Sequence, residues 1–168
     1  MGDEQSRPRR LWAPWRIEYI RSPKPGTCIF CDAPASNDDE ANLILARGSV
    51  CYVIMNRYPY NNGHLLIAPY VHVADLADLD RAVREELMEL TVLSVEILRE
   101  HMQPDGFNIG MNLGRAAGAG IEEHVHMHLV PRWNGDTNYI AVCSETKVIV
   151  QHLHETYREL RPLFAARM

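Results

Sequence analysis

The chain has 168 residues, the length of one ordinary domain, and its 46% hydrophobic and 23% charged residues are typical of a soluble globular protein. Its net charge of −5 argues against a broad nucleic-acid surface, because affinity for a polyanion comes mainly from clustered Lys and Arg. No apolar run approaches the length that spans a bilayer, and no apolar segment follows the polar start of the chain. We therefore expect a cytoplasmic protein with no nucleic-acid partner and no membrane anchor.

The first 42 residues carry few signals of regular structure. Residues 1–10 are polar and are interpreted as a frayed tail. Residues 11–16 (LWAPWR) have too much aromatic surface to be left in water, so we expect this segment to pack on the domain or on a partner subunit. Residues 32–42 are polar and lack periodicity, which predicts a loop.

Strand and turn signals alternate between residues 42 and 69. Residues 42–46 and 49–56 are strand-like stretches on either side of Arg47-Gly48, which predicts a hairpin. Asn61-Asn62-Gly63 is a second turn signal. It is followed by the short apolar run 64–69, which suits an interior strand that ends at a proline.

Apolar residues recur at three-and-four spacing between residues 80 and 102, which predicts one long amphipathic helix that ends before Pro104-Asp105-Gly106. Residues 107–113 and 124–131 predict two further strands, and residues 144–160 predict a final helix. Strands in hairpin succession with a helix inserted between them indicate an α+β fold with an antiparallel sheet.

Three histidines alternate in the last predicted strand, at His124, His126 and His128. Side chains two residues apart share one face of a strand, so the three imidazoles line one side while the residues between them pack on the other. A lone histidine is more often a solvated residue, or a core residue whose hydrogen bonds are made, than a functional one. Three histidines in strict alternation favour a functional site instead. Because a neutral imidazole nitrogen can attack phosphorus when an acceptor holds its other N–H, we predict that His126 is a nucleophile.

A glycine-rich loop, residues 112–120 (NLGRAAGAG), lies just before these histidines. Small residues let the backbone approach a phosphate and direct N–H groups at it. Such loops are more often plain turns when they stand alone. Next to three histidines, the loop predicts an anion site that contains a nucleophile.

Cys28 and Cys31 are spaced as Cys-x-x-Cys in a chain with no export signal, where a disulfide framework is poorly supported. A tetrahedral zinc site needs two more ligands, and His72 and His124 are the best choices. The alternative is that the two cysteines are buried small residues or a redox pair.

Residues 124–130 (HVHMHLV) resemble the His-x-His-x-His-x-x signature of the histidine triad (HIT) superfamily of nucleotide hydrolases and transferases, and residues 56–59 (NRYP) and 63–69 (GHLLIAP) agree with it. Within that superfamily, residues 112–136 and 11–16 resemble the bacterial diadenosine tetraphosphate phosphorylase-like branch. We therefore expect a single domain over 1–168, with a core over about 28–134, an N-terminal extension over 1–27 and a C-terminal segment over 135–168.

The resemblance implies a five-stranded antiparallel sheet with one long helix, to which the sequence adds a C-terminal helix, and it implies a homodimer. In zinc-bearing members the ligands match Cys28, Cys31, His72 and His124. The zinc would be structural, because the implied reaction requires no catalytic metal.

The resemblance also implies a role for each site residue. His126 would attack the α-phosphorus of a dinucleoside polyphosphate and hold AMP as a phosphoramidate, while His128 and His64 would orient the phosphate and the nucleophile. The residues implied to bind substrate are Asn56 on the ribose hydroxyls, and Asn112, Gly118 and Gly120, with His128, on the phosphates.

One position departs from the pattern of many hydrolytic members, which have a glutamine four residues before the first histidine of the triad. In this chain the position is occupied by Gly120. Phosphorylase-like members also lack the glutamine pattern at this position. We therefore expect phosphorolysis of diadenosine tetraphosphate to ADP and ATP. A HIT-family nucleotide hydrolase and a non-catalytic nucleotide-binding module are the alternatives.

Overall fold

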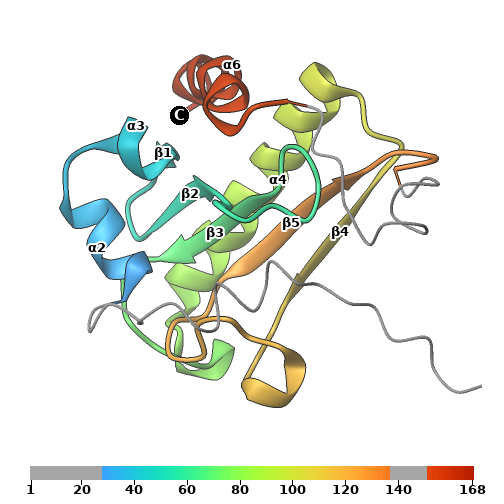
Figure 1. Cartoon of the computed structure of the whole chain (residues 1–168). Coiled ribbons are helices and arrows are strands. Elements are labelled where there is room, and N and C mark those ends of the chain that lie inside the picture. Colours follow the sequence, from blue (N-terminus) through green and yellow to red (C-terminus); the bar gives the residue numbers. More distant parts are fainter. Residues whose placement is uncertain (1–27, 137–150) are drawn as a thin grey trace, which may run out of the picture. The chain divides into compact units, whose positions relative to one another are not determined.

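The computed structural model describes residues 28–136 and 151–168, and these form a five-stranded sheet in the order β1-β2-β3-β5-β4 (Figure 1). Every neighbouring pair of strands is antiparallel. The strands are β1 (Ile44–Arg47), β2 (Cys51–Met55), β3 (Leu65–Pro69), β4 (Gly106–Met111) and β5 (Met127–Arg132). The predicted α+β class and the five-stranded antiparallel sheet are confirmed.

The α-helices of the described residues are α2 (Ile29–Ala35), α3 (Asp39–Asn42), α4 (Arg81–Met102) and α6 (Leu153–Ala165), and two 3-10 turns are η1 (Leu76–Asp78) and η2 (Arg115–Ala117). The long helix confirms its prediction to within a residue. None of these helices is long and apolar enough to cross a membrane.

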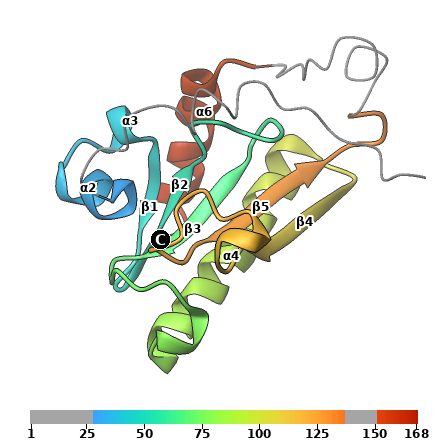
Figure 2. The ribbon, with the colours of Figure 1, turned by 60° about the horizontal axis from the view of Figure 1, so that its bottom comes forward.

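Helix α4 ends at Met102, where the backbone changes conformation. Gln103 adopts a left-handed conformation with φ of 49°, and Pro104 follows, so the helix cannot continue. The helix buries one face against the sheet through Val83, Leu87, Leu90, Ile97 and Leu98. In Figure 2 the sheet has α4 on one side and α2 on the other.

The sheet has two apolar faces because successive strand residues alternate. Odd-numbered residues of β2, β3 and β5 join the cluster with α4 and α6, whereas the even-numbered residues of β2 and β3 join a second cluster under α2. His128 pairs in register with Leu66, which belongs to this second cluster. The histidine site therefore lies on the α2 face of the sheet.

The prediction of a loop over residues 32–42 is wrong, because α2 and α3 occupy most of it. Pro34 cannot donate to the carbonyl of Phe30, but the hydroxyl of Tyr52 donates to that oxygen at 2.8 Å. Phe30 is buried in the second cluster, and the side chain of Asp38 caps α3. Tertiary contacts thus stabilise helices whose sequence is polar and contains proline.

The C-terminal helix differs from its prediction over 144–160. It begins at Leu153, after the cap residue His152, and continues to Ala165 because Leu160 and Phe164 are buried in the α4 cluster. The earlier part of the predicted span, 144–150, lies outside the described residues. The extension 1–27 and the segment 11–16 also lie outside them, so the single domain over 1–168 stays a prediction.

Candidate active site and metal centre

The three alternating histidines lie where β5 begins. Regular pairing starts only at Met127, because the N–H of Val125 donates to the carbonyl of Val73, in the loop after β3, at 2.8 Å. The predicted strand over 124–131 is thus shorter than expected. The alternation holds nevertheless, because Val125 and Met127 are buried in the α4 cluster while the histidine at 128 shares a face with Leu66.

His126 has the geometry of a neutral nucleophile. Its Nδ1–H donates to the carbonyl oxygen of His124 at 2.8 Å, and since a carbonyl can only accept, the lone pair is on Nε2. Only 6% of the residue is exposed, and burial lowers its pKa below the ordinary 6.5, although the bond to His124 acts in the opposite direction. The rings of Phe30 and His128 lie 4.6 and 4.8 Å from its ring centroid.

The structure brings His64 and His128 together beside His126. Nε2 of His64 lies 3.1 Å from Nδ1 of His128, and His64 is only 1% exposed. The ring of Tyr60 covers both, with centroids 4.8 Å from His64 and 5.9 Å from His128. Tyr60 was missed by the sequence analysis, and its place in the turn just before His64 is the signal that could have identified it.

Asn56 lies directly after β2 and contacts the same histidine. Its Oδ1 accepts from the N–H of Tyr58 at 2.9 Å, and its Nδ2 lies 3.2 Å from Nδ1 of His64. The residue therefore lies beside His64. Its role on the ribose hydroxyls stays a prediction.

The glycine-rich loop joins β4 to β5 and is largely exposed. Gly114 and Gly118 have φ of 75° and 86° on either side of η2, so a side chain at either position would be strained. Arg115 in this loop pairs with Glu122 at 3.4 Å. Within the described residues no hydrogen bond joins Asn112 to the three histidines, and the phosphate contacts assigned to Asn112, Gly118 and Gly120 stay predictions.

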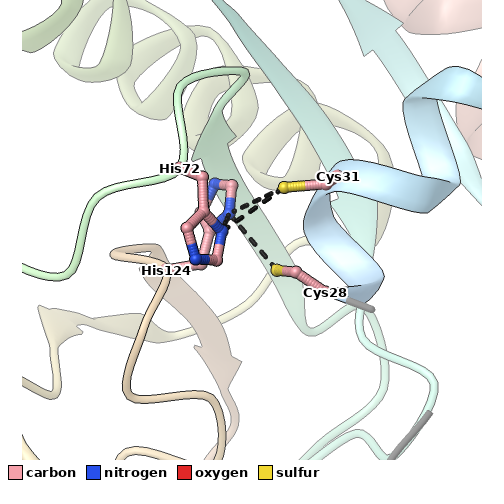
Figure 3. Close-up of side chains that lie close together, drawn as sticks. All are labelled: Cys28, Cys31, His72 and His124. Atoms are coloured by element: carbon pink, nitrogen blue, oxygen red, sulfur yellow. Dashed lines mark hydrogen bonds between the residues drawn. The ribbon is translucent and has the colours of Figure 1, made fainter. Parts of the chain in front are cut away.

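Cys28, Cys31, His72 and His124 converge from three parts of the chain (Figure 3). Cys28 is the residue just before α2, Cys31 lies in the first turn of this helix, and His72 follows β3. One potential ligand atom from each lies within 4.8 Å of all the others. The four residues predicted from spacing and resemblance thus form one cluster.

The distances within the cluster fit a tetrahedral zinc ion. Nδ1 of His124 lies 3.4 Å from the sulfur of Cys28, 3.6 Å from that of Cys31 and 3.2 Å from Nδ1 of His72. Ordinary Zn–S and Zn–N bonds in a tetrahedron give N···S edges of about 3.5 Å and N···N edges of about 3.3 Å. The Nε2–H of His124 donates to the carbonyl of Pro69 at 2.9 Å, so its Nδ1 lone pair is directed at the cluster.

The thiol of Cys31 is protonated at neutral pH when the cluster holds no cation. Burial, with a further contribution from Cys28, raises the pKa of Cys31 to about 11. A bound divalent cation reverses this balance, because it stabilises the thiolate directly. Burial also lowers the pKa of His124, which keeps this ring neutral as a metal ligand must be.

Comparison with known proteins assigns the family, because a sequence model of the HIT domain matches residues 39–135. This chain belongs to the HIT-domain family. The AP-4-A phosphorylase of Mycobacterium tuberculosis is 40% identical to it over 161 residues, which are 90% of this chain and 82% of the relative. The histidine site and the Cys-His cluster are therefore those of a HIT protein.

Solved HIT structures share the architecture. A Zn-bound histidine triad family protein from Mycobacterium smegmatis superposes with a TM-score of 0.67 at 26% identity, covering 84% of this chain and 95% of that one. A hypothetical histidine triad nucleotide-binding protein from Sulfolobus tokodaii gives a TM-score of 0.64 at 24% identity, covering 83% and 90% of the two chains. The second likeness supports the fold alone.

Proposed function

We propose that this HIT protein is a nucleotidyl-transfer enzyme that phosphorolyses diadenosine tetraphosphate to ADP and ATP. The observation that carries the proposal is the lone pair on Nε2 of the buried, neutral His126, in a chain 40% identical to an AP-4-A phosphorylase. A binding module would not need a nucleophile held in this tautomer.

The reaction has two steps on one nitrogen. Nε2 of His126 attacks the α-phosphorus, a P–N bond forms, the bridging P–O bond breaks, and ATP leaves. Inorganic phosphate then attacks the adenylylated histidine, the P–N bond breaks, and ADP leaves with the phosphate oxygen now bonded to the α-phosphorus. His128 and the N–H groups of the glycine-rich loop would stabilise charge on the phosphoryl oxygens in both steps.

Product analysis separates phosphorolysis from hydrolysis. The pure protein is incubated with diadenosine tetraphosphate, with and without inorganic phosphate, and the nucleotides are separated by chromatography. ADP plus ATP formed only with phosphate is the expected result. AMP plus ATP formed without phosphate would make the protein a hydrolase, and no turnover in either mixture would favour a binding module.

Zinc is proposed to be structural. Bound by Cys28, Cys31, His72 and His124, it would tie α2 to the loop after β3 and to the residue whose carbonyl holds His126. When bound, it neutralises thiolate charge and stabilises this arrangement. A reducing cytoplasm suits the site, because both cysteines must remain thiolates.

A second copy of the chain is proposed to pair along β4, which lies at the edge of the sheet. Ile109 in this strand is 49% exposed, on the same side as Phe107, over whose ring Arg99 of α4 lies. Met88 and Val92 lie on the face of α4 that carries Arg99, and they are 51% and 46% exposed. Among the described residues no strand pairs with the outer edge of β4, and such an edge beside exposed apolar residues suits a homodimer in which the two sheets join.

A further inference from the structure

Nδ1 of His64 is surrounded by donors. The backbone N–H of Tyr60 lies 3.1 Å from it, and a backbone N–H can only donate a hydrogen bond. The side-chain amide of Asn56 approaches the same atom with its Nδ2 at 3.2 Å. Nδ1 of His64 therefore accepts, and the proton of the neutral ring is on Nε2.

The orientation of the Asn56 amide is determined at its other end. Its oxygen must face the N–H of Tyr58, which lies 2.9 Å away, so its NH2 group faces His64. The backbone N–H of Asn56 also donates to the carbonyl of His64 at 2.9 Å, which ties the ends of β2 and β3 together. A carboxylate at position 56 would instead present an acceptor to Nδ1 of His64.

The tautomer of His64 determines that of His128. Nε2 of His64, which carries the proton, lies 3.1 Å from Nδ1 of His128, so this Nδ1 accepts and neutral His128 carries its proton on Nε2. His126 has the opposite arrangement, with the proton on Nδ1. Two neighbouring histidines thus offer opposite groups, a lone pair from His126 and an N–H from His128.

We propose that Asn56 is a positioning residue that, with the backbone N–H of Tyr60, fixes the tautomer of His64 and thereby makes His128 a hydrogen-bond donor on Nε2. The proposal rests on the proposed function for its purpose, since an N–H donor suits a phosphate oxygen beside the attacking lone pair of His126. These tautomers require an amide at position 56, because its NH2 group can donate to Nδ1 of His64 and a carboxylate cannot.

Nitrogen NMR of the zinc-loaded, substrate-free protein with labelled histidine tests the tautomers directly. Long-range proton–nitrogen spectra distinguish protonated from bare ring nitrogens, and His64→Gln and His128→Gln variants assign the signals. We expect protonated Nε2 in His64 and His128 and protonated Nδ1 in His126. A proton on Nδ1 of neutral His64 would overturn the proposal, whereas an absence of phosphorolysis would overturn only the proposed function.

Asn56→Asp tests the role of the amide, with Gln103→Glu as the control because it makes the same chemical change at an exposed helix end. We expect Nδ1 of His64 to gain a proton in Asn56→Asp and kcat to fall at least about tenfold, while the control retains both. An unchanged tautomer, with only a raised KM, would mean that Asn56 serves the ribose alone and would overturn the proposal. If Asn56→Asp did not fold, the spectrum of the unaltered chain would still decide the tautomer.

Discussion

At the scale of single residues, the site depends on which nitrogen of each imidazole carries a proton. Backbone carbonyls determine the tautomers of two of them. The carbonyl of His124 accepts a hydrogen bond from Nδ1–H of His126, and the carbonyl of Pro69 accepts one from Nε2–H of His124. In each of these neutral rings the other nitrogen therefore carries a lone pair, Nε2 in His126 and Nδ1 in His124. The alternation of the triad was visible in the sequence, but these carbonyl partners come from the packing of the chain.

The pH dependence of kcat/KM follows from the burial of His126. Only the neutral ring attacks, and because burial lowers its pKa below 6.5, protonation should remove activity only as the pH falls below that value. We expect the acidic limb of kcat/KM for diadenosine tetraphosphate to be centred below pH 6.5. An acidic limb centred at pH 7 or above would show that His126 is not the neutral group described.

At the scale of elements, periodicity predicted α4, and strand and turn signals predicted the five strands. Weak local signals missed α2 and placed the bounds of the C-terminal helix α6 too early. No local pattern indicates that the hydroxyl of Tyr52 replaces the hydrogen bond that Pro34 cannot make to Phe30. The Cys-x-x-Cys spacing identified half of the Cys-His cluster, and the resemblance supported the choice of His72 and His124 for the other half. The position of Tyr60 just before His64 places it near the site, but its contacts with two histidine rings depend on how its turn folds.

The hydroxyl of Tyr52 provides the test at this scale. Tyr52→Phe leaves the buried carbonyl of Phe30 without its donor, which should lower the free energy of unfolding by about 1–3 kcal/mol, measured by urea denaturation of the zinc-loaded protein. Tyr70→Phe is the control, because its hydroxyl bond to the carbonyl of Gly48 is long, at 3.4 Å, and only partly buried. Equal losses in the two variants would contradict the account of α2.

At the scale of the whole molecule, the Cys-His cluster and the edge of β4 are the two features expected to govern stability and association. The Cys-His cluster brings α2 together with the segment that carries His126, and β4 is the strand along which we propose that a second copy pairs. Neither takes part in the proposed bond changes. Their loss should therefore affect stability and association before it affects chemistry.

Removal of zinc tests the first feature. Strong chelators should lower the melting temperature of the protein before they reduce turnover, and Cys28→Ser/Cys31→Ser should have the lower melting temperature from the outset and no further response to chelator. Metal analysis and calorimetry measure both effects. Purified protein that contains no zinc, and whose stability zinc does not raise, would remove the metal from the account.

The edge of β4 is tested by Ile109→Lys, which places a charge in the proposed dimer surface. We expect a dimer for the unaltered chain and a monomer for the variant in sedimentation experiments. Leu76→Lys, at the exposed apolar residue of η1, is the control and should remain dimeric. A dimer that survives Ile109→Lys would place the interface elsewhere.

The central claim is that His126 becomes adenylylated, and trapping this intermediate tests it most directly. The protein is mixed with diadenosine tetraphosphate without inorganic phosphate, quenched at alkaline pH to preserve the P–N bond, digested, and analysed by mass spectrometry. We predict one AMP moiety on His126, released as ADP when phosphate is added before the quench, and no modification of His126→Ala. AMP attached to another residue, or an unmodified His126 in a protein that turns over, would contradict the account.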